Sequence, residues 1–331
     1  MADTMSAWRR ETYGPAAGTR REQVALPHPE RGEVLLRVHA TSLNAGDVRL
    51  LLGDPLLVRP VFGLTRPKHP VRGMEVAGTV VAVGSAVVGA EVGERVAGEL
   101  VGGGGLAEYV RVPSSRLVPV PPGVADTAAA TLPIAGGTAW QALDAAKVGL
   151  RGRQPERVLI IGASGGVGTF AVQLAALRGA EVWAACGARN APLARHLGAA
   201  HTLDHREEPL DALAARTFDA VIDIAGGLPL TTLQRLVASG GSVVLVTGNG
   251  GHVLGPVPRM IAAAFRSITG PRVRPLAATP RPEVLTKLLE LVDEGRIAPV
   301  IEKEYPFAEA PSALAHVEAG HTVGKVVVRG T

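Results

Sequence analysis

The stretch from residue 158 to residue 179 constrains the fold of this chain most strongly. Four consecutive apolar residues, 158–161, are typical of a strand that is buried on both faces. A glycine-dense turn, 162–168, follows directly, and residues 169–178 then have the apolar spacing of a helix that ends before Gly179. Because a dinucleotide-binding fingerprint needs a strand, a glycine turn and a helix in this order, the stretch predicts such a site.

Small residues are needed at three positions of this turn. Ala163 permits the tight turn, Gly165 lets a pyrophosphate approach the backbone, and Gly168 lets the helix pack close to the strand. The free N–H groups at the start of the helix then face an anion. The spacing A-x-G-x-x-G is also compatible with a glycine turn that binds no ligand. We expect these turn residues to bind the dinucleotide: Ser164, Gly165, Gly166 and Val167.

The end of the next predicted strand, residues 181–186, indicates which dinucleotide is bound. A carboxylate there would accept the ribose hydroxyls of NAD. Residues 186–189 read Cys-Gly-Ala-Arg instead, so the segment has no carboxylate to repel a 2′-phosphate. We therefore expect Gly187 and Arg189 to bind that phosphate, which favours NADPH over NADH. In the alternative interpretation, Arg189 is a solvated residue that opens a helix.

Composition and charge exclude several classes of function. The net charge is +4, from 34 basic and 30 acidic residues, and the basic residues are scattered along the chain. Since only 3% of the residues are aromatic as well, there is no case for nucleic-acid binding. Cys186 is the single cysteine, so neither an intramolecular disulfide nor a cysteine-cluster zinc site can form.

No segment predicts secretion or insertion into a membrane. The first ten residues contain no apolar core of signal-peptide length. The longest uncharged stretch, residues 236–258, is interrupted by glycines and prolines and does not have the pattern of a membrane helix. We therefore expect a cytoplasmic protein without a membrane partner.

The pattern of apolar residues changes along the chain. From residue 5 to about residue 126, short β-runs alternate with turn signals, which suggests an antiparallel, barrel-like domain. Beyond the stiff connection at 120–124, strands alternate with helices, which indicates a parallel, doubly wound sheet. From residue 281 the β-like pieces resemble the first domain, so we expect the chain to return there. Helices are expected at 169–178, 191–197, 210–215 and 230–238, and an edge strand at 273–278.

Six motifs, taken in order, match one known family. They are 38–47 (VHATSLNAGD), 73–78 (GMEVAG), 92–96 (VGERV), 106–110 (LAEYV), the glycine turn at 162–168, and 324–328 (GKVVV). With these motifs the chain resembles the medium-chain dehydrogenase/reductase superfamily, in its zinc-independent quinone oxidoreductase branch, over nearly its whole length. The resemblance implies an α/β protein with a GroES-like β-barrel catalytic domain (1–126 and 281–331) and a doubly wound Rossmann domain (127–280) that binds NADPH. It also implies a homodimer joined through the Rossmann edge strands.

Two positions depart from the zinc alcohol dehydrogenases of this superfamily. Those enzymes have a Cys and a His as catalytic metal ligands where the resemblance places Asn44 and Met74. Neither side chain is a usable thiolate or imidazole ligand for zinc, so we expect no metal. Without that Lewis acid, the resemblance favours hydride transfer from NADPH to a quinone or to the activated double bond of an enone or enoyl substrate.

The resemblance also assigns residues to the coenzyme and the substrate. Asn44 is the candidate catalytic residue, expected close to the nicotinamide ring, where it can hydrogen-bond a substrate carbonyl; the alternative is a turn-stabilising asparagine. Thr138 is expected at the nicotinamide ribose or ring, or else bonded to its own helix backbone. Thr247 and Asn249 end a strand where the backbone can hold the carboxamide. His205 is expected near the adenosine phosphate, with a surface histidine as the alternative.

A proton donor is missing from this pattern. Trans-enoyl reductases of the superfamily use a tyrosine in the N-terminal domain, but no tyrosine lies in the expected stretch after Asp47. Asp47 itself can donate only if burial raises its pKa, and a structural role in its turn is the favoured interpretation. Bulk water can protonate a quinol or a stabilised enolate, so the missing donor points away from enoyl thioesters.

We therefore expect a zinc-independent, NADPH-dependent reductase of a small hydrophobic, electron-poor substrate. One alternative is an NADPH-binding protein without redox turnover, with a structural, regulatory or cyclase-like role. Another is a zinc-free ketone or alcohol oxidoreductase, which needs an acid that the pattern does not supply. Residues 248–271 are expected to form either a lid over the site or a dimer contact.

Overall fold

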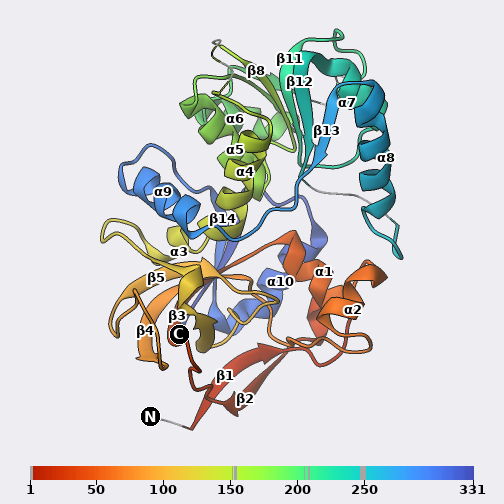
Figure 1. Ribbon diagram of the computed structural model, residues 1–331. Coiled ribbons are helices and arrows are strands. Elements are labelled where there is room, and N and C mark those ends of the chain that lie inside the picture. The colour runs from red at the N-terminus through yellow and green to blue at the C-terminus, as the bar shows by residue number, and fades with distance from the viewer. Residues whose placement is uncertain (1–2, 151, 153–154, 205, 208, 247–250) are drawn as a thin grey trace. The chain divides into compact units, whose positions relative to one another are not determined.

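The computed structural model describes residues 3–150, 152, 155–204, 206–207, 209–246 and 251–331. The chain forms two compact units, of which the first is Met1–Gly137 with Pro280–Thr331 and the second is Thr138–Thr279 (Figure 1). The sequence places the boundaries after residues 126 and 280, so residues 127–137 group with the first unit rather than the second.

β3 (Glu33–Leu43) is the centre of the large sheet of the first unit. Most of its residues are buried, and two register shifts in its pairing with β4 re-aim the strand along its length. The strand order is β14-β15-β3-β4-β5-β7, and β6 also pairs with β3. The last two strands of the chain, β14 and β15, thus share a sheet with strands from its N-terminal part. The other strands of this unit are β4 (Glu75–Val83), β5 (Arg95–Glu99), β6 (Tyr109–Pro113), β7 (Leu117–Pro119), β14 (Ile301–Pro306) and β15 (Lys325–Arg329), with β1 (Thr4–Arg9) and β2 (Arg20–Ala25) in a separate pair.

Two longer helices complete the first unit by burying an apolar side. α9 (Pro282–Asp293) buries Val284 and Leu288, one turn apart, as an amphipathic helix does. α10 (Ala310–Ala319) contributes Leu314 to a core cluster that also contains Val326 of β15. The shorter helical segments are Ala16–Gly18, α1 (Ala45–Leu52), Leu56–Val58, α2 (Arg59–Phe62), Ser114–Arg116, α3 (Asp126–Ala129), the π-helix Leu132–Gly136 and Phe307–Glu309.

A six-stranded parallel sheet, β10-β9-β8-β11-β12-β13, organises the second unit. Every residue of β11 (Phe218–Asp223) is buried, as expected for a strand covered on both faces. β13 (Arg272–Pro275) lies at the edge, which confirms the predicted edge strand and explains why Pro275 is tolerated. The GroES-like and doubly wound α/β fold class is therefore confirmed. The other elements are α4 (Gly137–Ala145), β8 (Arg157–Ile161), α5 (Gly166–Leu177), β9 (Glu181–Ala185), Ala188–Asn190, α6 (Ala191–His196), β10 (His201–Leu203), α7 (Leu230–Leu236), β12 (Val237–Leu245) and α8 (Val257–Thr269).

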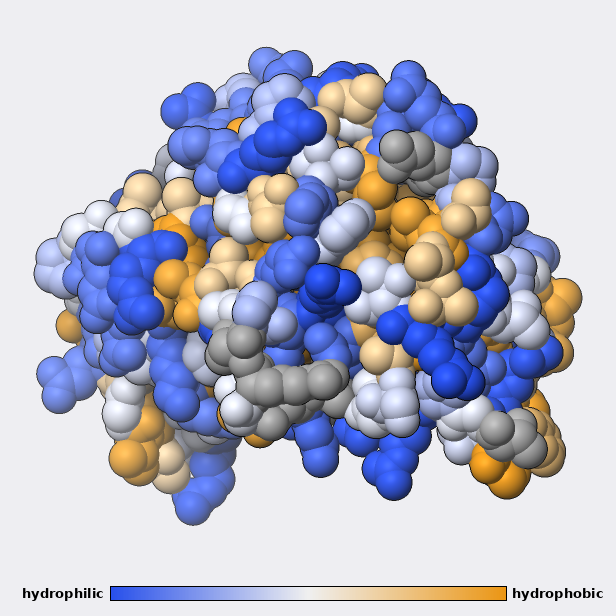
Figure 2. All heavy atoms as spheres, turned by 90° about the horizontal axis from the view of Figure 1, so that it is seen from above, coloured by the Kyte–Doolittle hydropathy of each residue, from blue (hydrophilic) through white to orange (hydrophobic). Residues whose placement is uncertain are grey.

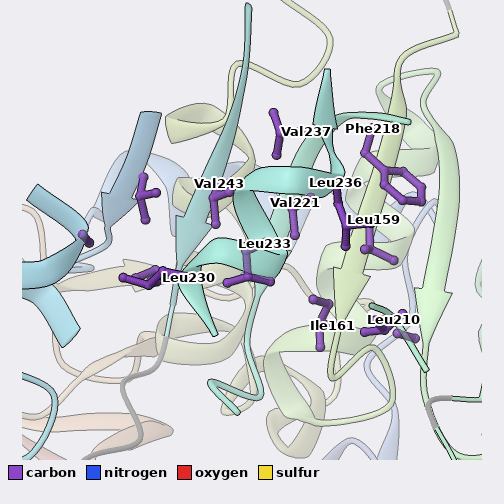
Figure 3. Packing of buried hydrophobic residues seen from close by; sticks show 14 of the residues in the cluster. Leu159, Ile161, Leu210, Phe218, Val221, Leu230, Leu233, Leu236, Val237 and Val243 are labelled. Carbon is purple, nitrogen blue, oxygen red and sulfur yellow. The ribbon is translucent and has the colours of Figure 1, made fainter. Parts of the chain in front are cut away.

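One apolar core joins strands and helices on a single face of this sheet. Leu159 of β8, Val221 of β11 and Val243 of β12 belong to the same cluster as Leu233 of α7 (Figure 3). Ala263 of α8 is fully buried in this cluster as well. The core therefore fixes α7 and α8 to the half of the sheet that contains the edge strand.

The prediction of a helix at residues 210–215 is wrong, because these residues form turns. So short a segment gains few helical hydrogen bonds for the cost of nucleation, and Arg216 directly after it has a left-handed φ of 57°. Leu210 instead inserts into the apolar core. The sequence also does not predict β10, because three residues give almost no periodic signal.

α8 has one anchored side and one exposed apolar side. Arg259 donates from Nη2 to the buried carboxylate of Asp223, 2.9 Å away at the end of β11. On the outer side, Phe265 and Ile268 are 69% and 78% exposed. α8 falls within the segment 248–271, whose first residues lie outside the described part of the chain.

Hydrophilic residues make up most of the molecular face shown in Figure 2, and apolar residues form smaller groups among them. Within the described ranges, none of the helices has the length and hydropathy of a membrane span.

Candidate functional site

The predicted glycine turn connects β8 to α5 in the second unit. Gly162 has a left-handed φ of 85°, which favours glycine. The N–H groups of Gly162 and Ala163 both donate to the carbonyl of Ala185, at 3.1 and 3.2 Å, and so fix the turn to the end of β9. α5 begins at Gly166 after Gly165, so its first-turn N–H groups point out of the helix at the carboxyl edge of the sheet.

Gly165 and Gly168 have different steric surroundings in this turn. A Cβ on Gly168 would lie 2.2 Å from the carbonyl oxygen of Gly162, so the close packing of helix and strand excludes any larger residue there. A Cβ on Gly165 would meet nothing nearer than 3.7 Å. The fold therefore requires glycine at 168, whereas at 165 the space is free for an approaching ligand, as a pyrophosphate site needs.

A second loop, after β9, lies beside the turn. The side-chain amide of Asn190 donates to the hydroxyl of Ser164 at 3.0 Å, which brings the loop and the turn together. A Cβ on Gly187 would have no neighbour within 4 Å, and Arg189 is exposed, without an ion pair or hydrogen bond among the described residues. The two loops thus offer open backbone and a free guanidinium in one place, a set that fits a phosphorylated dinucleotide.

Asp204 is a residue of this site that the sequence does not reveal. Its carboxylate accepts the N–H of Ala188 at 2.8 Å and the N–H of Arg206 at 3.0 Å. Burial, and next the charge of Asp204, raise the pKa of the neighbouring Cys186 thiol. Because Asp204 follows β10, a strand without a sequence signal, its approach to the loop that contains Arg189 comes from the fold alone.

Of the remaining residues in the second unit that are predicted to bind the coenzyme, only Thr138 lies in the described part of the chain. Thr138 is half-buried in the first turn of α4. His205, Thr247 and Asn249 lie outside the described residues. These assignments stay predictions.

Asn44 in the first unit belongs to a buried ionic cluster with Glu75 and Lys325. Lys325 Nζ donates to Asn44 Oδ1 at 2.5 Å and to Glu75 Oε1 at 2.8 Å. Asn44 Nδ2 donates to the same Glu75 oxygen at 2.7 Å. The side chains of Glu75 and Lys325 are 0% and 2% exposed. We call these three residues the Lys325 cluster.

The charges of the Lys325 cluster determine how the Asn44 amide is oriented. Its oxygen must face the ammonium group and its nitrogen the carboxylate, since the reverse would oppose donor to donor. The second carboxylate oxygen of Glu75 accepts the backbone N–H of Ile134 at 2.6 Å. One N–H of Asn44 Nδ2 has no acceptor among the described residues, so the amide retains a donor for a substrate oxygen.

Asp47 has the structural role that the sequence favours. Its two carboxylate oxygens accept the N–H groups of Asn44, at 2.9 Å, and Gly73, at 2.8 Å. Complete burial raises its pKa to about 6, although those two hydrogen bonds act in the opposite direction. Asp47 therefore holds Asn44 at the start of α1.

Glu99 is a second carboxyl group that the sequence does not single out. It lies on β5 directly opposite Glu75 of β4, so the two side chains are on the same face of the sheet. Burial, and next the charge of Glu75, raise the pKa of Glu99 to about 7. A carboxyl group with such a pKa can exchange a proton near neutral pH.

The residues at the two metal-ligand positions do not fit a catalytic zinc. Asn44 supplies an amide in place of a thiolate, and Met74 a thioether in place of an imidazole. The ammonium of Lys325, 2.5 Å from Asn44 Oδ1, also places a positive charge where a cation would have to bind. In the described part of the chain, no group of three or more His, Cys, Asp and Glu side chains is arranged to hold a metal ion.

Two family models match the chain. Residues 30–122 match the alcohol dehydrogenase GroES-like domain, and residues 197–328 match a zinc-binding dehydrogenase domain. The first match covers the strands that contribute Glu75 and Glu99. The second covers most of the parallel sheet and the return of the chain to the first unit.

Known proteins similar to this chain match it from end to end. The chloroplast envelope quinone oxidoreductase homolog of Arabidopsis thaliana is 37% identical, over 98% of both chains. The mitochondrial NAD(P)H oxidoreductase RTN4IP1 of Mus musculus is 33% identical, over 98% of this chain and 89% of its own. The structure of the quinone oxidoreductase from Coxiella burnetii superposes with a TM-score of 0.86 at 28% identity, covering 99% of this chain and 100% of the other. The chain therefore belongs to the medium-chain dehydrogenase/reductase superfamily and is an oxidoreductase that uses a nicotinamide dinucleotide.

Proposed function

We propose that this protein is a zinc-independent, NADPH-dependent reductase of quinones or of the activated double bond of enones. The Lys325 cluster is the observation that carries this proposal, because Asn44, which stands where the resemblance expects a metal ligand, is an amide oriented by a buried ammonium and a buried carboxylate. A fixed donor of this kind suits a substrate oxygen that gains negative charge during reduction. The similarity to proteins named quinone oxidoreductase supports the same acceptor class.

Asn44 acts in this proposal on the oxygen of the acceptor. A reduced nicotinamide coenzyme held at the glycine turn would supply a hydride to the double bond of the acceptor, whose π electrons would shift onto that oxygen. The free N–H of Asn44 Nδ2 stabilises the developing enolate or quinol anion, while Lys325 and Glu75 keep the amide in place. Asn44→Ala is then expected to lower kcat more than it raises KM, because the interaction strengthens in the transition state.

Glu99 is the proposed proton donor. Its raised pKa of about 7 leaves a protonated fraction at neutral pH, so it can protonate the carbon of an enolate. Water protonates a quinol oxygen readily, whereas a carbon centre depends more on a placed acid. Glu99→Gln should therefore reduce kcat with an enone by about 100-fold and with a quinone by much less.

The experiment that tests the function is NADPH oxidation against a panel of quinones, enones and enoyl thioesters, followed by product analysis. Turnover that yields quinol or saturated ketone supports the proposal. Allylic alcohol as the product would instead show a ketone reductase. Tight NADPH binding without oxidation across the panel would favour the alternative non-redox role.

NADPH is the proposed coenzyme because Arg189 is exposed and free to bind a 2′-phosphate. The carboxylate of Asp204, which follows β10, lies beside the loop that contains Arg189 but accepts two backbone N–H groups. Because its oxygens already accept these hydrogen bonds, the Asp204 carboxylate is less able to accept hydrogen bonds from the ribose hydroxyls of NADH. We therefore keep the predicted preference for NADPH over NADH. Asp204 is the nearby negative charge that acts against binding of the 2′-phosphate.

A homodimer and a cytoplasmic location complete the proposal. β13 is an edge strand and the adjacent α8 exposes Phe265 and Ile268, which together offer a surface that a second copy can cover. In light scattering after size exclusion, Phe265→Ser with Ile268→Ser should yield monomers, whereas an unchanged mass would contradict this contact. Two of the similar proteins named above are a chloroplast and a mitochondrial protein, so the proposed cytoplasmic location rests on the sequence of this chain alone.

A further inference from the structure

A polar cleft lies within the second unit at the amino-terminal ends of its strands. Its volume is about 590 Å³, and its walls come from the starts of β12 and β13 and from the segments before β11 and after α4. The glycine turn and the loop containing Arg189 follow the carboxyl ends of β8 and β9. Because the sheet is parallel, the cleft is at the opposite edge of the sheet from the candidate dinucleotide site.

The cleft exists because β12 leaves the sheet near its start. Phe218 of β11 pairs with Val237 of β12. Ala220, two residues after Phe218, pairs with Ser242, which is five residues after Val237. The intervening residues 238–241 bulge out of the ladder and line the cleft. Gly240 has a left-handed φ of 78°, and a Cβ on it would have no neighbour within 4 Å.

Among the described residues, four cationic side chains and no carboxylate line this cleft. They come from separate segments: Lys147 follows α4, Arg216 precedes β11, and Arg272 and Arg274 lie on β13. Within the described ranges none of the four takes part in an ion pair. Arg274 Nη1 donates to the carbonyl of Ala145 at 2.9 Å, which fixes its guanidinium group.

Like charges in a shared concave site repel one another unless an anion neutralises them. Arginine guanidinium groups bind phosphate oxygens in pairs, and three of the four cations are arginines. The cleft volume of about 590 Å³ is far larger than a single phosphate group needs. The described part of the lining contains no aromatic residue on which a base could stack.

We propose that this cleft binds a small molecule that carries a polyphosphate chain, and that it recognises the chain itself. The site is independent of the coenzyme turn and of the proposed reductase activity. Its ligand spans several cations at once, so an oligophosphate binds and a single phosphate does not bind appreciably.

Calorimetric titration of inorganic tripolyphosphate into the full-length protein tests this site. The variant Arg216→Gln with Arg272→Gln should weaken binding at least about tenfold, since it removes two charged partners. Arg266→Gln, an exposed arginine of α8 outside the cleft, is the matched control and should leave the Kd within about twofold. Thermal melting checks that each variant is folded. Lys147→Gln is a milder second variant, in which the affinity for tripolyphosphate should fall about threefold.

Arg189→Ala distinguishes the cleft from the dinucleotide turn, because the turn also attracts phosphates. Unchanged tripolyphosphate affinity in Arg189→Ala, with loss in the cleft variants, supports the proposal. Three results would each overturn the proposal. They are no binding of tripolyphosphate by the wild type, wild-type affinity in the double cleft variant, or a loss of affinity in Arg189→Ala but not in the cleft variants.

Discussion

The glycine turn of the second unit and the Lys325 cluster of the first unit are both placed to meet negative charge, but they do so with different groups. The turn offers backbone N–H groups at the start of α5, exposed because Gly165 has no side chain. The cluster offers one amide N–H of Asn44, oriented by a buried ion pair between Lys325 and Glu75.

This difference determines what each site tolerates. A backbone site depends on shape, so a single added Cβ can block it without disturbing any charge. A buried ionic site depends on the pairing of opposite charges, since removal of either partner leaves the other charged and desolvated. The following predictions separate these two kinds of dependence, beginning with the largest effect.

Gly165→Val should abolish dinucleotide binding while the protein stays folded. A Cβ at this position meets no protein atom within 3.7 Å, so the methyl groups occupy the space intended for the pyrophosphate. Gly168→Val is the matched comparison, because its Cβ would lie 2.2 Å from the Gly162 oxygen and should impair folding itself. Fluorescence titration with NADPH and thermal melting of both variants measure the two effects. Retained NADPH binding in Gly165→Val would contradict the assignment of the turn.

Lys325→Met should lower the free energy of unfolding by about 3–5 kcal/mol, because it leaves the carboxylate of Glu75 buried without its partner. Urea denaturation measures the loss. Lys303→Met, which removes an exposed lysine, should cost less than about 1 kcal/mol. The double variant Lys325→Met with Glu75→Gln should be more stable than Lys325→Met alone. Equal stability of these two variants would show that the pair is not energetically coupled.

The two sites also differ in how far the sequence predicts them. Residues 158–179 are contiguous, so their strand, turn and helix follow from local pattern, and the structure contains all three. The members of the Lys325 cluster are separated by 31 and 250 positions, and only the fold of both chain ends into one sheet brings them together. Asp204 escapes prediction for a similar reason, since it depends on β10, which has no periodic signal.

Arg189→Ala should weaken NADPH binding by about 2 kcal/mol and leave NADH binding unchanged, since a charged hydrogen bond to the 2′-phosphate is lost. Asp204→Asn tests the opposing charge next to the loop of Arg189 and should strengthen NADPH binding slightly. The dissociation constants of NADPH and NADH, measured for the wild type and both variants, test these expectations. Equal losses for NADPH and NADH in Arg189→Ala would mean that Arg189 does not contact the 2′-phosphate.

The smallest predicted effect concerns pH and again belongs to the first unit. Burial raises the pKa of Asp47 to about 6 and that of Glu99 to about 7, from ordinary values of 3.8 and 4.5. The folded state therefore holds protons that the unfolded chain releases. Their stabilising contribution is complete below about pH 4 and is lost as the pH rises through 6 and 7. The free energy of unfolding, measured with urea across this window, should decrease accordingly.

Glu99→Gln isolates one part of this pH dependence. Without the Glu99 carboxyl group, the decrease between about pH 5 and pH 7 should become shallower, while the part due to Asp47 remains. Glu91→Gln, at an exposed position two residues after Gly89, is the control and should reproduce the wild-type curve. If Glu99→Gln also reproduced it, Glu99 would titrate at its ordinary pKa and would not hold a proton at neutral pH. The proposed proton donor would then fail on thermodynamic grounds, before any rate had been measured.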